Sequence, residues 1–98
     1  MGQSLQSANF RIESRLRDAA RGNSVAYFDL GVAYSVGADG VQMDLVEAHK
    51  WFNLAALRGD ARGQACRAEI AGEMSAREIA EAQRQARAWL ATTTRHAA

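Results

Sequence analysis

The sequence predicts an all-α domain of about five helices packed in antiparallel pairs. Its 98 residues contain no proline, and 48% of them are apolar. Apolar side chains recur at spacings of three and four, the period of helices with a buried side. Glycine and capping residues interrupt this pattern repeatedly, which indicates short connections between helices. A chain of this size builds one hydrophobic core, so residues 1–98 are expected to form a single domain.

The first helix is predicted over residues 5–20 as a capping helix within the segment 1–22. Charged residues occupy most of the side opposite its apolar stripe, so the stripe should pack on the rest of the domain. Gly22 is expected to end this helix. The stripe consists of Leu5, Ala8, Ile12, Leu16, Ala19 and Ala20.

The second helix, about 24–36, is apolar on nearly every side. Asn23 or Ser24 is its expected cap, and only Asp29 and Ser35 are obvious polar positions within it. A helix of this kind must be covered on more than one side. Any side left open would be a binding surface, and complete burial is the alternative.

The third helix is predicted to run from Asp44 to Gly59 after a glycine-rich loop. Asp44 and Glu47 have the spacing of a capping box, in which Asp44 accepts from a first-turn amide and Glu47 reaches back to the amide of Asp44. The apolar side of this helix comprises Leu45, Ala48, Trp51, Phe52, Ala55 and Ala56.

Two further helices are predicted in the segment 60–91, as a C-terminal capping pair. The fourth follows Asp60 and has mainly small apolar residues, so it should bury little surface. The fifth opens with a second capping box, Ser75 with Glu78, and is expected to end at Ala91. Residues 92–98 are expected to form a frayed tail.

No catalytic, metal or cofactor site is predicted, and the chain is not expected to be an enzyme. His49 has no second histidine or cysteine at a ligand spacing, and His96 lies far along the chain. Cys66 is interpreted as a structural thiol because no histidine stands at a fixed distance from it. Glu78 and Glu81 are interpreted as a cap and solvated helix surface, not as an acid pair.

Composition excludes several classes of protein. Twelve basic residues balance eleven acidic ones, so the overall charge does not direct the chain toward nucleic acid or an anionic membrane. No apolar stretch approaches the roughly 20 residues of a membrane span. Residues 1–10 lack the features of a secretory signal, so a bacterial cytoplasmic location is expected, with the periplasm left open.

The second and third helices carry the pattern of a known repeat. Tyr27-x-x-Leu30-Gly31-x-x-Tyr34 with Ala48-x-x-x-Phe52 looks like the tetratricopeptide pattern, but the loop between the helices is longer and richer in glycine. The wider set resembles the Sel-like repeat, an α-solenoid relative. It comprises Leu30-Gly31, Tyr34, Gly37, Gly40-Val41, Asp44, Ala48, Trp51, Ala55-Ala56 and Gly59.

The resemblance extends over about residues 23–90, because the tail resembles the segment after the final repeat in small bacterial members. It implies a fragment of a right-handed α-α superhelix. The loop 37–41 has one residue more than is usual in the family. Only one complete repeat is present, at 23–59, so the segments 1–22 and 60–91 are expected to cap it.

The resemblance also implies function, namely an adaptor that binds a protein or peptide through the second helix. The expected contact residues are Val25, Phe28, Asp29, Val32 and Ser35. Their mainly apolar character suits a partner helix or an extended peptide. The alternative for Phe28 and Val32 is packing beneath the first helix.

The sequence leaves two other functions open. A single repeat with an uncovered helix side could self-associate as a homodimer across a two-fold axis. Alternatively, arginines near Trp89 could contact nucleic acid, although interleaved glutamates weaken that field and disfavour it. These arginines are Arg77, Arg84, Arg87 and Arg95, and the glutamates are Glu73, Glu78 and Glu81.

Overall fold

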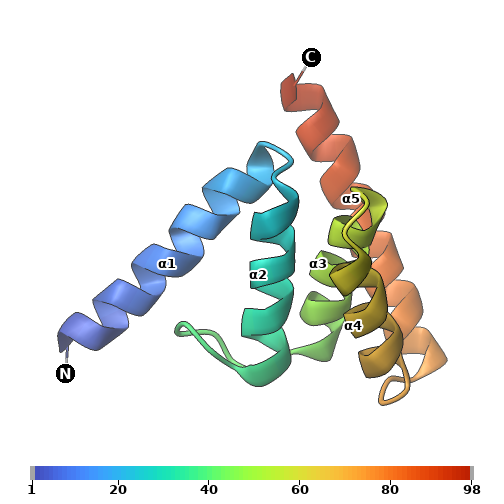
Figure 1. The fold of residues 1–98 in the computed structure, drawn as a ribbon, viewed down its shortest axis with the longest axis horizontal. Helices are drawn as coiled ribbons and strands as arrows, with labels where there is room; N and C mark the ends of the chain where they lie inside the picture. The colour runs from blue at the N-terminus through green and yellow to red at the C-terminus, as the bar shows by residue number, and fades with distance from the viewer. Residues whose placement is uncertain (1, 98) are drawn as a thin grey trace.

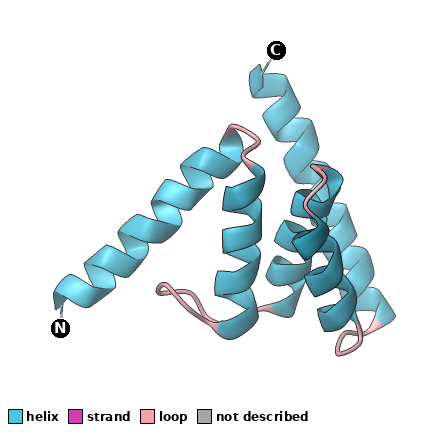
Figure 2. Cartoon of the chain, viewed as in Figure 1, coloured by secondary structure: helices cyan, strands magenta, loops and turns pink. Residues whose placement is uncertain are grey.

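The computed structural model describes the backbone of residues 2–97 and the side chains of residues 11–93. Over this range the chain forms five α-helices and no strand (Figures 1 and 2). The prediction of an all-α fold is therefore confirmed. The helices are α1 (Gly2–Ala20), α2 (Ser24–Val36), α3 (Leu45–Leu57), α4 (Ala61–Ala71) and α5 (Ala76–Ala97). None of them combines the length and apolar character required to cross a membrane.

Helix α3 is the centre of the arrangement. It packs antiparallel to α2 on one side and to α4 on the other, and it also contacts α5 (Figure 1). Helix α1 packs against α2 near the connecting loop, and its N-terminal part diverges from α2 (Figure 1). Helices α2 and α4 therefore run in the same direction, on the two sides of α3.

The helix ends follow the local chemistry of the sequence. Asn23 caps α2, since its Oδ1 accepts from the amides of Val25 and Ala26 at 2.9 and 3.3 Å. The capping box of α5 is reciprocal: Glu78 N donates to Ser75 Oγ at 3.1 Å, and Ser75 N donates to Glu78 Oε1 at 2.8 Å. Both caps satisfy first-turn amides that have no partner within their helix.

The capping box predicted for α3 is only half formed. Asp44 Oδ1 accepts from Glu47 N at 3.1 Å as predicted, but the amide of Asp44 donates to the carbonyl of Tyr34 at 2.9 Å. Glu47 therefore does not reach back, and its carboxylate accepts instead from Trp51 Nε1 at 3.0 Å and from Lys50. This partner satisfies an indole N–H that would otherwise be buried unpaired.

Helix α5 extends past its predicted end at Ala91, into the segment expected to form a frayed tail. The hydroxyls of Thr92 and Thr93 donate at 3.0 Å to the carbonyls of Ala88 and Trp89, one turn earlier. These bonds satisfy the two hydroxyls within the helix. No glycine or proline follows to break it, and α5 reaches Ala97.

The apolar stripe of α1 is confirmed in part. Ile12 and Ala19 are buried, and Leu16 packs against the core. Ala20 is exposed because it lies in the last turn, where α1 passes into the loop. The side chains of Leu5 and Ala8 lie outside the described residues.

Two glycines allow the helices on either side of α3 to approach it closely. A Cβ atom on Gly31 of α2 would lie within 3.0 Å of three ring atoms of Phe52. On the other side, a Cβ atom on Gly63 of α4 would lie 2.8 Å from both the Cβ of Ala55 and the carbonyl oxygen of Phe52. The sequence pattern predicted the first contact and not the second.

Trp51 joins three helices in the core. Its side chain is 2% exposed, and its ring stacks on Tyr27 of α2 at 5.9 Å between centroids. The ring of Trp89 from α5 meets it edge-on at 4.8 Å, and Trp89 Nε1 donates to the hydroxyl of Tyr27 at 3.3 Å. Offset and edge-on aromatic pairs stabilise beyond the area they bury.

His49 is a buried histidine on α3. It is 3% exposed, and its Nδ1 atom has no hydrogen-bond partner among the described residues. Burial lowers the pKa of His49 below its ordinary value, and the positive charge of Arg67 on α4 lowers it further. The imidazole is therefore neutral in the folded protein near neutral pH.

The stability of the fold should decrease with falling pH through His49. The unfolded chain takes up a proton on this residue as the pH falls through about 6.5, whereas the folded protein does so only at lower pH. As the pH falls below about 6.5, the unfolded state binds more protons than the folded state, so the free energy of unfolding decreases. At pH values well above about 6.5, His49 contributes no pH dependence.

Urea unfolding at a series of pH values between about 8 and about 5 measures this effect. The variant His49→Gln, in which the group cannot titrate, serves as control and should show the weaker pH dependence. An equal slope in both proteins would contradict the account of His49.

Candidate functional site

Exposed apolar side chains gather along α2. Five large hydrophobic residues are exposed among the described side chains, and three of them, Val25, Val32 and Val36, lie on α2 at 56%, 38% and 67% exposure. A fourth, Met43, contacts the C-terminal end of α2 at Gly37. We call the exposed side of this helix the α2 face; it consists of Val25, Phe28, Asp29, Val32, Ser35 and Val36.

The spacing along the helix explains why these residues share one side. Positions 25, 28, 32 and 35 alternate steps of three and four, so they form one continuous stripe. The opposite side holds Tyr27, Leu30 and Ala33, which are buried against the other helices. The predicted set omitted Val36, although its spacing of four from Val32 places it on the same side.

Phe28 forms the floor of the α2 face. Its ring is half-buried and packs against the ring of Phe52 on α3, with 5.6 Å between centroids. The guanidinium of Arg62 from α4 lies over the same ring, 4.1 Å from its centroid. Phe28 is thus oriented toward α3 and α4, and Val32 remains partly exposed. The alternative, in which both pack beneath α1, does not describe these contacts.

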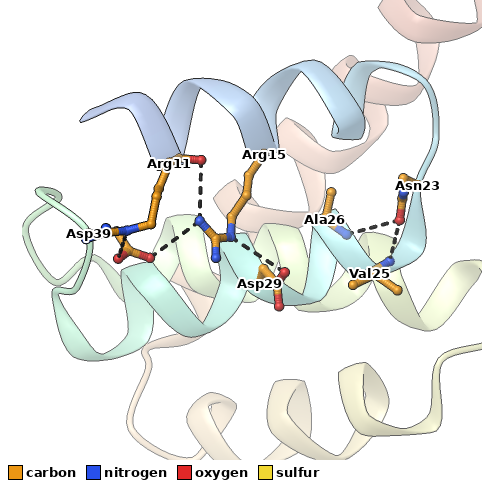
Figure 3. Close-up of polar contacts among 7 residues, drawn as sticks. All are labelled: Arg11, Arg15, Asn23, Val25, Ala26, Asp29 and Asp39. Atoms are coloured by element: carbon orange, nitrogen blue, oxygen red, sulfur yellow. Dashed lines mark hydrogen bonds and ion pairs between the residues drawn. The ribbon is translucent and has the colours of Figure 1, made fainter. Parts of the chain in front are cut away.

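The α1 edge of this face is polar. Figure 3 shows Arg11 and Arg15 of α1 directed toward two carboxylates, one on α2 and one in the loop. Arg15 lies 3.5 Å from Asp29, and Arg11 lies 3.0 Å from Asp39. Both arginines and Asp29, with Ser14 and Asp18 of α1, line an open depression of about 290 Å³ between α1 and α2. Exposed ion pairs of this kind contribute about 0 to 1 kcal/mol each, so they orient side chains more than they stabilise the fold.

The loop between α2 and α3 supplies one of those carboxylates. Asp39 adopts a positive φ of 58°, in the left-handed region that aspartate tolerates better than most residues. Gly37 and Gly40 on either side also have positive φ. The loop between α2 and α3 therefore reaches α1, and Asp39 also lies 3.7 Å from Arg15.

The α4 edge is formed by Arg62, which pairs with Asp60 at 2.9 Å while it covers Phe28. Asp60 also caps α4 through the amide of Arg62. Ser35, at the other end of the face, donates its hydroxyl to the carbonyl of Val32 at 2.8 Å. The α2 face is thus an apolar strip between two edges that carry arginine.

The residues considered as candidate catalytic or metal-binding groups do not lie together on the α2 face. Within residues 11–93, no group of three or more His, Cys, Asp or Glu side chains is placed to hold a metal ion. Cys66 is half-buried on α4 and packs against the core. His49 is enclosed in the α3 core. What the strip can do is bury the apolar surface of another molecule.

Of the C-terminal arginines, Arg84 lines an open depression of about 270 Å³ together with Lys50 and Trp89. Arg84 pairs with Glu81 at 2.6 Å, and this contact with the bond from Gln85 lowers the pKa of Glu81 to about 2. Trp89 is half-buried against Trp51. Arg77 and Arg87 are exposed, and the side chain of Arg95 lies outside the described residues.

Residues of the repeat pattern are mostly internal. Tyr27, Leu30, Gly31 and Trp51 are buried at the contact of α2 with α3, so the pattern describes packing. The residues of the α2 face lie between those positions. Comparison of the chain with protein-family models, with curated proteins and with solved structures found no match.

Proposed function

We propose that this chain is a non-catalytic protein-interaction module, an adaptor that binds a helix or a short extended segment of another polypeptide on the α2 face. The observation that carries this proposal is the clustering of exposed apolar side chains. Three of the five such residues among the described side chains lie on α2, and Met43 adjoins its end. Contiguous exposed apolar surface between polar edges is characteristic of sites that bind other proteins.

The dimensions of the strip favour a helical partner. Val25 and Val36 are separated by eleven residues, which corresponds to about 16 Å along the helix axis. A partner helix of about three turns spans that length. The alternating three- and four-residue spacing of the strip is the spacing that packs against a second helix.

We also propose that α2–α3 and α4–α5 are successive hairpins of a Sel-like, right-handed superhelix. The packing of α3 against both α4 and α5 supports this relation. So do the close approaches at Gly31 and Gly63, one in the first helix of each hairpin. In such an arrangement the first helix of each hairpin lines the inner surface, and α2 is the helix whose inner side is apolar.

Replacing Val32 with glutamate should abolish partner binding and leave the fold intact. The carboxylate would have to be desolvated at the centre of the strip, whereas in the free protein it can extend into water. A pull-down from the source cell extract, quantified for the parent and for Val32→Glu, measures the effect. Circular dichroism establishes beforehand that both proteins are equally helical.

Leu57→Glu is the matched control. Leu57 is 62% exposed near the end of α3 and lies off the α2 face, so the same change in chemistry should leave the captured proteins unchanged. If parent, Val32→Glu and Leu57→Glu capture the same proteins in the same amounts, the α2 face is not the binding surface.

A further inference from the structure

We infer that the helix that occupies the α2 face is α2 of a second copy of this chain, packed antiparallel across a two-fold axis. This inference rests on the proposed function, because it takes the α2 face as the binding surface. The inference adds which molecule binds there and how its helix is oriented relative to α2. The distribution of charge along the strip supports both.

The end of the strip at Val25 is basic. Arg21 directly precedes α2 and is exposed. The guanidinium of Arg58 lies beside Gly22, where a Cβ would be 2.7 Å from it. Arg62 lies over Phe28, one turn into the strip, and its charge is partly compensated by Asp60. The helix dipole adds partial positive charge at this N-terminal end of α2.

The end of the strip at Val36 is acidic. No lysine or arginine occurs between residues 22 and 49, a stretch that includes Asp44. Asp39 also lies at this end, but Arg11 and Arg15 of α1 compensate its charge. Helix α4 contributes Glu69, which is exposed seven residues after Arg62 and therefore on the same side of α4. Helices α2 and α4 run in the same direction (Figure 1). Glu69 belongs to the last turn of α4, so we infer that it lies toward the C-terminal end of α2.

Because of this polarity, the strips of two copies are complementary in charge only when their α2 helices are antiparallel. A two-fold axis perpendicular to the strip lays the basic end of one copy on the acidic end of its partner, and it does so twice. It also opposes the two helix dipoles. A parallel arrangement would instead place arginines on arginines, which costs affinity. Isologous contacts of this kind close at two copies.

The apolar residues fit the same arrangement. The axis would pass near the middle of the strip, between Phe28 and Val32. Val25 of one copy would then lie opposite the region of Val36 in the other. The alternating three- and four-residue spacing allows side chains of one helix to insert between those of the other.

Light scattering coupled to size exclusion, over a series of protein concentrations at low salt, measures the mass. The inference predicts a dimer at high concentration for the parent and for Leu57→Glu, and a monomer for Val32→Glu. A parent that remains monomeric throughout would overturn the inference. So would a dimer that persists in Val32→Glu, because the contact would then lie elsewhere.

A mixing experiment tests the antiparallel direction. Arg62→Glu alone and Glu69→Arg alone should each weaken the dimer, because each homodimer then has two like-charge contacts. In a mixture, the heterodimer has opposite charges at both contacts. It should form with an affinity about tenfold or more above either homodimer. Equal affinities for all three species would overturn the antiparallel arrangement.

A further variant and the capture experiment keep the outcomes separate. Arg62 also pairs with Asp60 and covers Phe28, so Arg21→Glu at the same end provides a second variant if Arg62→Glu loses helicity. A monomeric parent whose captured partner depends on Val32 would reject the second copy and retain the proposed function. A parent that neither dimerises nor captures a partner through Val32 would reject both.

Discussion

Replacing Trp51 with alanine should lower the free energy of unfolding by about 3 to 5 kcal/mol. The side chain is 2% exposed and contacts Tyr27 and Trp89, so its removal leaves a cavity where three helices meet. It also removes the donor that satisfies Glu47, although that carboxylate retains Lys50. A loss of this size is a large fraction of the total stability of a small domain. Urea unfolding followed by circular dichroism measures it.

Trp51→Phe separates the two contributions. Phenylalanine keeps much of the apolar contact and loses the hydrogen bond to Glu47, so its cost should be clearly smaller than that of alanine. Trp89→Ala provides a comparison at a half-buried ring of the same cluster. An unfolding curve for Trp51→Ala that superimposes on that of the parent would refute the packing described for α2, α3 and α5.

Introducing leucine at Gly31 should destabilise the protein by about 1 to 3 kcal/mol or more. Even a Cβ atom at this position would lie within 3.0 Å of three atoms of the Phe52 ring. That ring is 2% exposed and packed against Phe28, so it cannot move without displacing its neighbours. The helices must separate, which weakens every contact between α2 and α3.

Gly72→Leu is the matched control for Gly31→Leu. Gly72 has a helical φ of −64°, and a Cβ atom there meets only the carbonyl oxygen of Glu69, at 3.4 Å. This change should have little effect on the unfolding midpoint. Equal effects at Gly31 and Gly72 would show that the close approach of α2 to α3 does not contribute to stability.

Local chemistry was sufficient to predict most of the helical framework. Asn23, Ser75 and Glu78 cap the helices as their spacing predicted, because a cap depends on residues adjacent in sequence. The glycine at position 31 was identified because it belongs to a pattern of several residues. Gly63 belongs to no such pattern, and its role depends on the backbone of α3 beside it.

Features that depend on distant residues were predicted less well. Glu47 was assigned to the cap of α3, but the indole of Trp51 and the carbonyl of Tyr34 together determine its actual partner. The contact of Asp39 with Arg11 joins residues 28 positions apart, and no local signal indicates it. Tertiary contacts of this kind override a capping preference of modest size.

The open side of α2 was the least predictable feature of the site. A helix that is apolar on nearly every side has no periodic signal to indicate which side stays uncovered. The choice among sides depends on where α1 and α4 pack, which only the three-dimensional arrangement determines. The predicted contact residues came from the repeat resemblance; Val25 and Val32 among them are exposed, and Phe28 is half-buried.

The unfolding free energy of Val32→Glu tests the central claim, that α2 packs on one side and leaves the other free for a partner. It is measured in urea at a protein concentration low enough to keep parent and variant monomeric. The account predicts a change of less than about 1 kcal/mol, as for an exposed position. A loss of about 3 kcal/mol or more, comparable to that of a core substitution, would contradict it, because Val32 would then belong to the core.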